Sequence, residues 1–321
     1  MQVFIQSQQD YDEAVRNKLH KHDELVLQNC REFISVNTDV TVAKNGRCKT
    51  EGSSPVTITV KEDGKVTAEG KAVIVGYDNA NVIAKGNCKV TLHGDSIGNI
   101  YNNCHVTLLG KAKASAADNC TVHAHDESGV SAFGNSKIYT YQKAVANGTD
   151  VASLTGKDSS TLTGQKKCSI NAQDNCLVFA TDDCTVKAAD NCLIIANKNA
   201  NIVSQNNCVV MSNDNPNINL LDQSEHFNID TITDKNIMGC LKRLSKSKAF
   251  MERPYISLQL LMANIPPAQK EAVNRRLVTM GCKDQVSTKN FLYNLIEVDS
   301  PRRHHSSHHH PKQTASGYMG R

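Results

Sequence analysis

Cysteine, histidine and aspartate are the residues of this 321-residue chain whose types and spacing suggest chemistry. Twelve cysteines are present, and several recur at multiples of eight residues, as Cys168, Cys176 and Cys184 do. Regularly spaced thiolates are potential zinc ligands, but zinc sites usually contain a paired C-x-x-C motif, which this sequence lacks. Because Ala and Ser occupy the same phase elsewhere, we interpret these cysteines as buried structural thiols and predict no metal site.

Histidines and acidic residues also occur together in the middle of the chain. Carbohydrate-active β-helices use acids on an outer face, but that chemistry needs a carboxylate pair at a fixed separation, and no such pair is evident here. The sequence also lacks a phosphate-binding loop, a nucleophile elbow and an H-E-x-x-H motif. We therefore predict a protein that is not an enzyme and needs no cofactor. The residues concerned are His93, His105, His123, His125, Asp95, Asp118 and Asp126.

An octad repeat positions these residues, and it runs from Ala72 to Leu220 without insertion or deletion. Its first position is small, its third is aliphatic, and its last two are often Asp-Asn, Gly-Asn or Asn-Asn, as in CTVKAADN and CKVTLHGD. Inward positions one, three and five predict a short strand. The polar residues that follow tolerate a left-handed backbone and predict a turn. Such units bury their apolar side only by stacking into a solenoid.

The spacing of similar residues indicates how many octads form one coil. Cys88, Cys104 and Cys120 recur at sixteen residues, whereas a three-sided coil would need a spacing of twenty-four. The sequence therefore predicts a mainly β fold, a two-sided β-solenoid with about sixteen residues per coil. Asp158, Asp174 and Asp190 also recur at sixteen. Calcium-binding solenoids need glycine-rich turns that are missing here, so we interpret these aspartates as solvated turn residues.

Outward positions of the last coils carry an unusual apolar surface, which we call the apolar columns. A monomeric surface does not normally leave such a patch open. Two explanations remain: the C-terminal helices fold back over the columns, or the columns form a dimer or partner interface. The residues are Leu177, Phe179, Leu193, Ile195, Val209 and Met211.

Charge divides the chain at the end of the repeats. Residues 1–234 contain 21 Lys and Arg against 27 Asp and Glu, a net −6, whereas residues 235–321 contain 15 against 5, a net +10. We predict a small α+β N-terminal cap over 1–36, the solenoid over 37–222, an α-helical domain over 231–299 and a disordered, basic, His-rich tail over 300–321. Helices are expected over 10–19, 235–250, 255–265, 267–280 and 287–298.

Basic residues of the C-terminal part form the clearest binding signal. They suit nucleic-acid phosphates, an anionic protein or the acidic solenoid itself. The set, called the basic cluster below, is Lys242, Arg243, Lys246, Lys248, Arg275, Arg276, Arg302 and Arg303.

The octads, among them CTVHAHDE and CKVTLHGD, resemble the short repeats of bacterial and phage-borne β-solenoid proteins and, loosely, the architecture of bactofilins. The resemblance covers residues 40–222 and concerns architecture alone. It implies a rigid spacer, scaffold or structural component, and a phage or mobile-element origin. The large terminal domains depart from bactofilins and are expected to block end-to-end stacking of rods.

Three functional hypotheses follow. The first is a non-enzymatic scaffold that self-associates or binds a protein partner through its helical domain. The second is a nucleic-acid-associated protein that uses the basic cluster. The third is a carbohydrate-binding or carbohydrate-cleaving β-helix, which aromatic platforms would favour. Since no secretory signal or long apolar run is evident, we expect a cytoplasmic protein, or a virion component if it is phage-encoded, without membrane contact.

Overall fold

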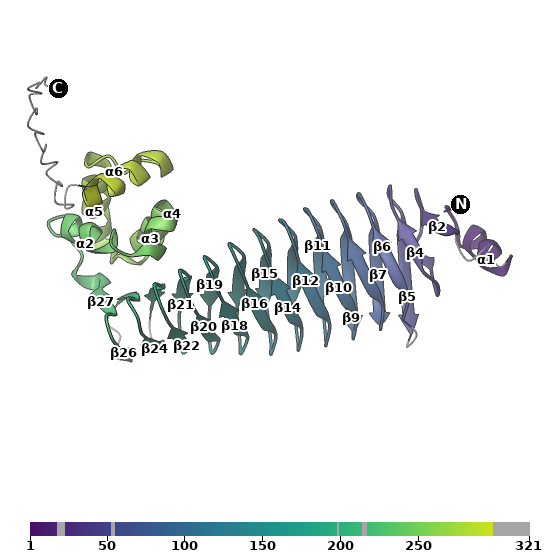
Figure 1. Ribbon diagram of the computed structural model, residues 1–321, viewed down its shortest axis with the longest axis horizontal. Coiled ribbons are helices and arrows are strands. Elements are labelled where there is room, and N and C mark those ends of the chain that lie inside the picture. Colours follow the sequence, from purple (N-terminus) through teal and green to yellow (C-terminus); the bar gives the residue numbers. More distant parts are fainter. Residues whose placement is uncertain (18–22, 53–54, 198, 214–216, 298–321) are drawn as a thin grey trace, which may run out of the picture.

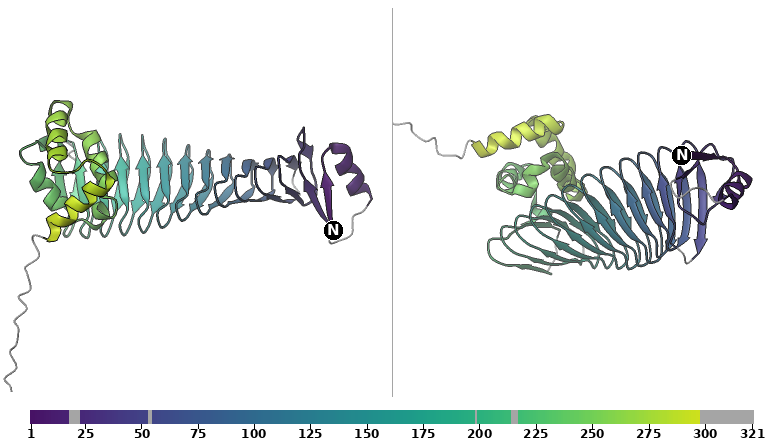
Figure 2. Two further views of the ribbon diagram at one scale, coloured as in Figure 1. Left: turned by 90° about the horizontal axis from the view of Figure 1, so that it is seen from above. Right: turned by 45° about the vertical axis from the view of Figure 1, so that its right-hand side comes forward.

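A computed structural model shows a long stack of parallel coils with a short helix at its N-terminal end and a group of helices at its C-terminal end (Figure 1). The structure describes residues 1–17, 23–52, 55–197, 199–213 and 217–297. From β2 onward, consecutive strands alternate between two sheets of 14 and 13 strands, called sheet A and sheet B here, so each coil contributes one strand to each sheet. This confirms the predicted two-sided β-solenoid, and Figure 2 shows the coils as a regular row.

Sheet A is built from strands of three or four residues: β1 (Gln2–Ile5), β2 (Glu24–Leu27), β4 (Val40–Val42), β6 (Thr57–Val60), β8 (Val73–Gly76), β10 (Lys89–Leu92), β12 (His105–Leu108), β14 (Thr121–Ala124), β16 (Lys137–Thr140), β18 (Ser153–Gly156), β20 (Ser169–Ala172), β22 (Thr185–Ala188), β24 (Asn201–Ser204) and β26 (Ile218–Leu220).

Sheet B faces it across the thin core: β3 (Ile34–Ser35), β5 (Arg47–Gly52), β7 (Lys65–Gly70), β9 (Asn81–Gly86), β11 (Ile97–Ile100), β13 (Lys113–Ala116), β15 (Gly129–Ala132), β17 (Val145–Gly148), β19 (Thr161–Gly164), β21 (Leu177–Ala180), β23 (Leu193–Ala196), β25 (Val209–Ser212) and β27 (Glu225–Asn228).

Strand register confirms the sixteen-residue coil and corrects one detail. Val90 of β10 pairs with Val106 of β12, sixteen residues later. The first coils are longer, because Cys48 of β5 pairs with Val66 of β7 eighteen residues later. Cys48, which numbering alone places at the first octad position, therefore aligns through Val66 with Val82, a third-position residue. The two additional residues fall between Cys48 and Ile58, in the coil that contains Pro55.

Aspartate is frequent in the turns because it serves both the backbone and the neighbouring coil. The seventh octad residue has a left-handed backbone, with φ of 57° at Asp78 and 64° at Asp174. Asp and Asn adopt this conformation more readily than most residues with a Cβ atom. The carboxylate of Asp174 also accepts a hydrogen bond of 3.2 Å from the backbone N–H of Asp158, one coil earlier. These aspartates therefore link successive turns.

The first octad position combines small size with a hydrogen-bond donor. The Ser96 hydroxyl donates to the carbonyl of His93 at 2.7 Å, and the Cys120 thiol contacts the equivalent carbonyl of Ala117 at 3.1 Å. All twelve cysteines are free thiols, and eleven of them are buried. Burial raises the pKa of the Cys120 thiol, which keeps it protonated and able to donate. The cysteines are thus core residues, as predicted.

Glycines in the middle of the solenoid leave space for large neighbours. The stretch around Gly148, Gly156 and Gly164 has few bulky inward side chains of its own. A Cβ atom on Gly156 would lie 2.7 Å from Cδ1 of Leu162, and one on Gly148 would lie 3.1 Å from Cδ2 of Leu154. The space at these glycines is therefore filled by leucines of the strands that follow them, Leu154 after Gly148 and Leu162 after Gly156.

The helices lie at the two ends. Helix α1 (Gln8–Arg16) begins at a capping box formed by Ser7 and Asp10. At the C-terminal end, η1 (Ile229–Thr231) precedes α2 (Ile237–Leu244), α3 (Lys248–Glu252), α4 (Pro254–Asn264), α5 (Pro267–Thr279) and α6 (Gln285–Glu297). We call α2–α6 the helical unit.

The expectation of a single helix over 235–250 is wrong, because the chain forms two helices there. Helix α2 ends at Leu244, and the side chain of Ser247 accepts a hydrogen bond from the backbone N–H of Phe250 and begins α3. Serine favours caps over helix interiors, which explains the break in a sequence with continuous helical spacing. None of the helices in the described ranges is long and apolar enough to cross a membrane.

Candidate functional site

The helical unit covers the apolar columns. Leu177, Leu193, Ile195 and Met211 are completely buried, Val209 is 7% exposed, and Phe179 is half-buried. They form one apolar cluster with side chains of the helices, including Ile237, Leu241, Leu244, Phe250, Leu258, Leu261 and Leu292. Figure 1 shows the helices lying over the C-terminal end of the rod, where β21 and β27 are labelled. Of the two explanations for the columns, the structure contains the fold-back of the helices.

Polar contacts surround this apolar contact area. At the connection between α3 and α4, Glu252 accepts hydrogen bonds from the Ser159 hydroxyl and from the Asn175 side-chain amide, the latter at 3.1 Å. Arg253 donates to the Thr161 hydroxyl at 2.6 Å. Farther along, the side-chain amide of Asn197 donates to that of Asn264 at 2.7 Å. The rod therefore holds the helical unit by an apolar centre and polar contacts from two sides.

Glu252 and Arg253 are the functional residues that sequence reasoning missed. Burial lowers the pKa of Arg253, and its Nη2 atom is among the buried polar atoms without a hydrogen-bond partner in the described part of the chain. The sequence offered only a weak signal, because Glu252 and Arg253 are an acid and a base just before Pro254, at a break between helices. Nothing in the sequence connects them with the turn around Ser159, more than 90 residues earlier.

The basic cluster is divided between two helical segments and partly neutralised. Arg243 forms an ion pair with Glu225 at 3.1 Å, and its guanidinium lies 4.0 Å from the centre of the Phe227 ring. Arg275 approaches Glu271 at 3.9 Å. Arg243 therefore contacts the last strand of sheet B, so one residue of the cluster meets the solenoid, one of the three partners that the sequence left open.

The other members of the basic cluster have different surroundings. Lys246 and Lys248 are exposed and line, with Arg243, an open pocket of about 330 Å³ between α2–α3 and the last coils. Lys242 and Arg276 are also exposed on α2 and α5. Arg302 and Arg303, like the rest of the predicted His-rich tail, lie outside the described residues.

Tyrosine and histidine rings form a second surface feature on the outer face of sheet A. His123 stacks on Tyr139 of the next coil with ring centres 4.8 Å apart, and His125 stacks on Tyr141 at 4.7 Å. We call these four residues the ring block. His123 and His125 are among the histidines named from the sequence, and the sixteen-residue register places Tyr139 and Tyr141 beside them. Burial and the nearby imidazoles of His125 and His105 lower the pKa of His123.

The geometry of the ring block argues against a carbohydrate platform. Sugar-binding platforms need a broad aromatic face directed outward, whereas these rings cover one another's faces along the rod, with interplanar angles of 11° and 12°, and only the end faces of each stack lack a further ring. The described residues also contain no group of three or more His, Cys, Asp or Glu arranged to hold a metal ion.

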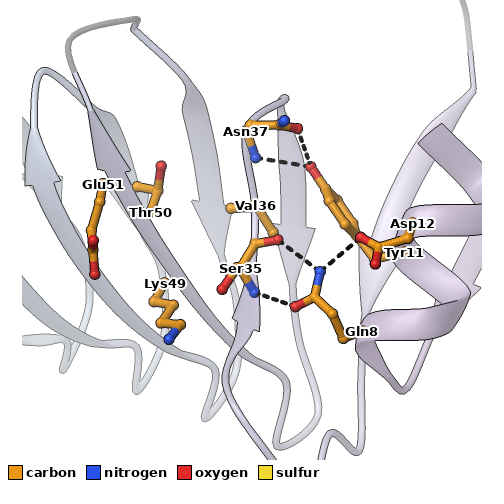
Figure 3. A pocket seen from close by; sticks show the side chains of 9 residues that line it. All are labelled: Gln8, Tyr11, Asp12, Ser35, Val36, Asn37, Lys49, Thr50 and Glu51. Carbon is orange, nitrogen blue, oxygen red and sulfur yellow. Dashed lines mark hydrogen bonds between the residues drawn. The ribbon is translucent and has the colours of Figure 1, made fainter. Parts of the chain in front are cut away.

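A pocket of about 390 Å³ lies between α1 and the first strands of sheet B (Figure 3). The Gln8 side chain accepts a hydrogen bond from the backbone N–H of Ser35 at 2.7 Å and donates to its carbonyl at 3.2 Å. The Tyr11 hydroxyl accepts a hydrogen bond from the backbone N–H of Asn37 at 2.9 Å. Gln8 thus occupies the hydrogen-bonding groups of the β3 edge, where another strand would otherwise pair. This geometry fits the predicted N-terminal cap.

Comparisons with protein-family models, with curated proteins and with solved structures found no match for this chain. The structure shows the stacked parallel coils of a β-solenoid, and the resemblance to bactofilins stays a prediction from the sequence.

Proposed function

We propose that this protein is a non-enzymatic scaffold: a rigid β-solenoid that holds a basic helical unit at a fixed place on one end and one face. The observation that supports this most directly is the burial of the apolar columns under the helices. A helical unit on a flexible linker would present its surface in many orientations. One that shares a core with the rod presents Lys246 and Lys248 in a constant position relative to the solenoid.

The proposed partner is a protein with an acidic surface that meets the exposed lysines of the helical unit. Charge supports this assignment, because the net +10 of residues 235–321 is attached to a rod with a net −6. A cytoplasmic or virion location and a phage origin belong to the same proposal, as expectations of the architecture.

The experiment tests whether the helical unit is held rigidly. Ile195→Asp places an uncompensated charge in the buried contact area, while Asn147→Asp changes an exposed residue of the same sheet-B column three coils earlier. We expect Ile195→Asp to release the helices, so that small-angle scattering gives a larger maximum dimension and trypsin cuts between 229 and 236. Asn147→Asp should behave as wild type.

Equal scattering curves and equal protease resistance of both variants would contradict the proposal. Light scattering on the full chain adds an independent check. A defined oligomer that Ile195→Asp dissociates would instead assign the columns to contacts between copies.

A further inference from the structure

The outer face of sheet A carries a row of basic and ring-bearing side chains. From β6 to β24, the outward strand residues and the residue after each strand include no Asp or Glu, and every one of these positions lies in the described part of the chain. The acidic residues that follow these sheet-A strands lie in the turns, as Asp158 does next to Lys157. The basic and ring-bearing positions are Lys61, Lys89, Lys137, Lys157, Lys187, His93, His105, His123, His125, Tyr77, Tyr139 and Tyr141.

The lysines of this face lie within the acidic part of the chain. All five lysines are exposed, although residues 1–234 carry a net −6. The equivalent positions of sheet B from β9 to β17, which the helices leave open, also contain no Asp or Glu and carry Lys85 and Lys113 but no histidine, so the histidines and stacked tyrosines distinguish sheet A more than its lysines do. The helices lie on sheet B, so the basic face of sheet A stays uncovered along about 43 Å, nine coil spacings of about 4.8 Å.

The His123–Tyr139 stack of the ring block is flanked by a threonine on each side along the sheet. Tyr139 pairs along the sheet with Thr155, and His123 pairs with Thr107 on the other side. A threonine side chain is too short to cover an aromatic ring, so each end of the His123–Tyr139 stack retains a ring face that no further ring covers. Lys137 precedes Tyr139 on the same strand, and Lys157 follows on the next coil.

We propose that the outer face of sheet A binds single-stranded nucleic acid, with lysines contacting phosphates along the rod and bases stacking on the ends of the ring block. The combination of exposed lysines and uncovered ring faces favours single-stranded nucleic acid over other polyanions. Lysines alone would serve any anionic polymer, but exposed ring faces beside them suit bases, which stack on aromatic side chains with little regard to sequence. Bases must be unpaired to reach such a face, which favours a single strand over a duplex.

The test measures binding of a fluorescein-labelled 30-nucleotide oligo-dT to the full chain by fluorescence anisotropy over a salt series. Tyr139→Ser with Tyr141→Ser should weaken binding about tenfold or more, the loss expected for removing base stacking. Tyr139→Phe should retain affinity. Lys89→Gln, Lys137→Gln and Lys157→Gln together should lower the slope of log Kd against log salt by about 2, at about 0.7 per phosphate contact.

Matched controls come from the opposite sheet and from the helices. Tyr101→Ser and Lys113→Gln change exposed sheet-B residues at the octad positions of Tyr141 and Lys137, and both should bind as wild type. The lysine variants keep the test valid if the tyrosine double variant folds poorly.

Three results would overturn the inference. The first is no saturable binding of oligo-dT. The second is equal binding of dextran sulfate with no effect of the tyrosine variants, which would indicate an acidic polymer held by charge alone. The third is binding lost in Lys246→Gln with Lys248→Gln but retained in the sheet-A variants, which would place the nucleic acid on the helical unit. None of these results concerns the rigid attachment of the helices, so the scaffold proposal is tested separately.

Discussion

The two sheets of the solenoid have the same inward pattern and opposite outward surfaces. Across the core, both present small and aliphatic residues, as Val90 of sheet A and Val82 of sheet B illustrate. Outward, the last coils of sheet B carry Leu193 and Ile195 under the helices, whereas sheet A carries lysines, histidines and tyrosines in solvent. The difference shows that the octad determines the rod, and that the outward positions determine what each face contacts.

The strongest way to separate these two roles is to place the same charge inward and outward on one strand. Ile138 of β16 is 1% exposed and its neighbour Lys137 is exposed. Ile138→Asp buries an unpaired carboxylate between the sheets and should destabilise the chain by about 4 kcal/mol or more. Lys137→Asp should change the free energy of unfolding by about 0.5 kcal/mol or less. Chemical denaturation measures both, and similar losses would contradict the inward–outward assignment.

Truncating a column residue should weaken the helical contact without weakening the rod. Leu193→Ala removes a fully buried side chain, so we expect a loss of about 2–4 kcal/mol confined to the helical unit. Hydrogen exchange should then lose protection over 237–297 and keep it in β8–β18. Val145→Ala is the control, because Val145 occupies the same column and is 36% exposed. A uniform loss of protection along the rod would refute the separation.

Adding a methyl group tests the tight packing of the middle coils. Gly156→Ala brings Cβ within 2.7 Å of Leu162 and should cost about 1–3 kcal/mol through overpacking. Gly129→Ala adds a methyl on the outer face, where the nearest atom is Cγ of Lys113 at 3.9 Å. It should be neutral or slightly stabilising. Thermal unfolding of the two variants gives the comparison, and a neutral Gly156→Ala would show that Leu162 moves freely.

The smallest effect is a dependence of stability on pH. Burial lowers the pKa of His123 and of His226, so both imidazoles resist protonation in the folded chain. Their stabilising contribution is complete above the unfolded value of about 6.5 and is lost as the pH falls toward the lower folded values. The melting temperature should therefore fall slightly between pH 7 and pH 5.5. His123→Phe should reduce that fall, and an unchanged profile would argue that His123 titrates normally.

The sequence predicted the fold well because the octad is a local and repeated signal. Small, aliphatic and turn residues at fixed positions define the strand, the turn and the coil length, and the left-handed backbone at Asp78 or Asp174 follows from residue type. The exceptions lie where the repeat is interrupted. The eighteen-residue coil that moves Cys48 to a different inward position depends on corner residues with no periodic signal.

Tertiary contacts limited what could be predicted of the site. The apolar columns were visible because they recur at sixteen residues, but their covering by Leu241 and Phe250 depends on how helices return to the rod. The ring block required the register, since His123 and Tyr139 lie sixteen residues apart and meet only through coil stacking. Arg253 had no periodic signal at all.

The sixteen-residue register sets the unit in which this chain can change its length. Deleting one whole coil, such as 129–144, would shorten the rod by about 4.8 Å and leave every remaining side chain on its original face. Deleting a single octad between the ring block and the apolar columns would move all strands that follow to the opposite sheet, so the apolar columns and the helices would lie on the side that carries the ring block. A change of length by sixteen residues therefore keeps each outward side chain on its original sheet, whereas a change by eight residues moves the side chains that follow to the other sheet.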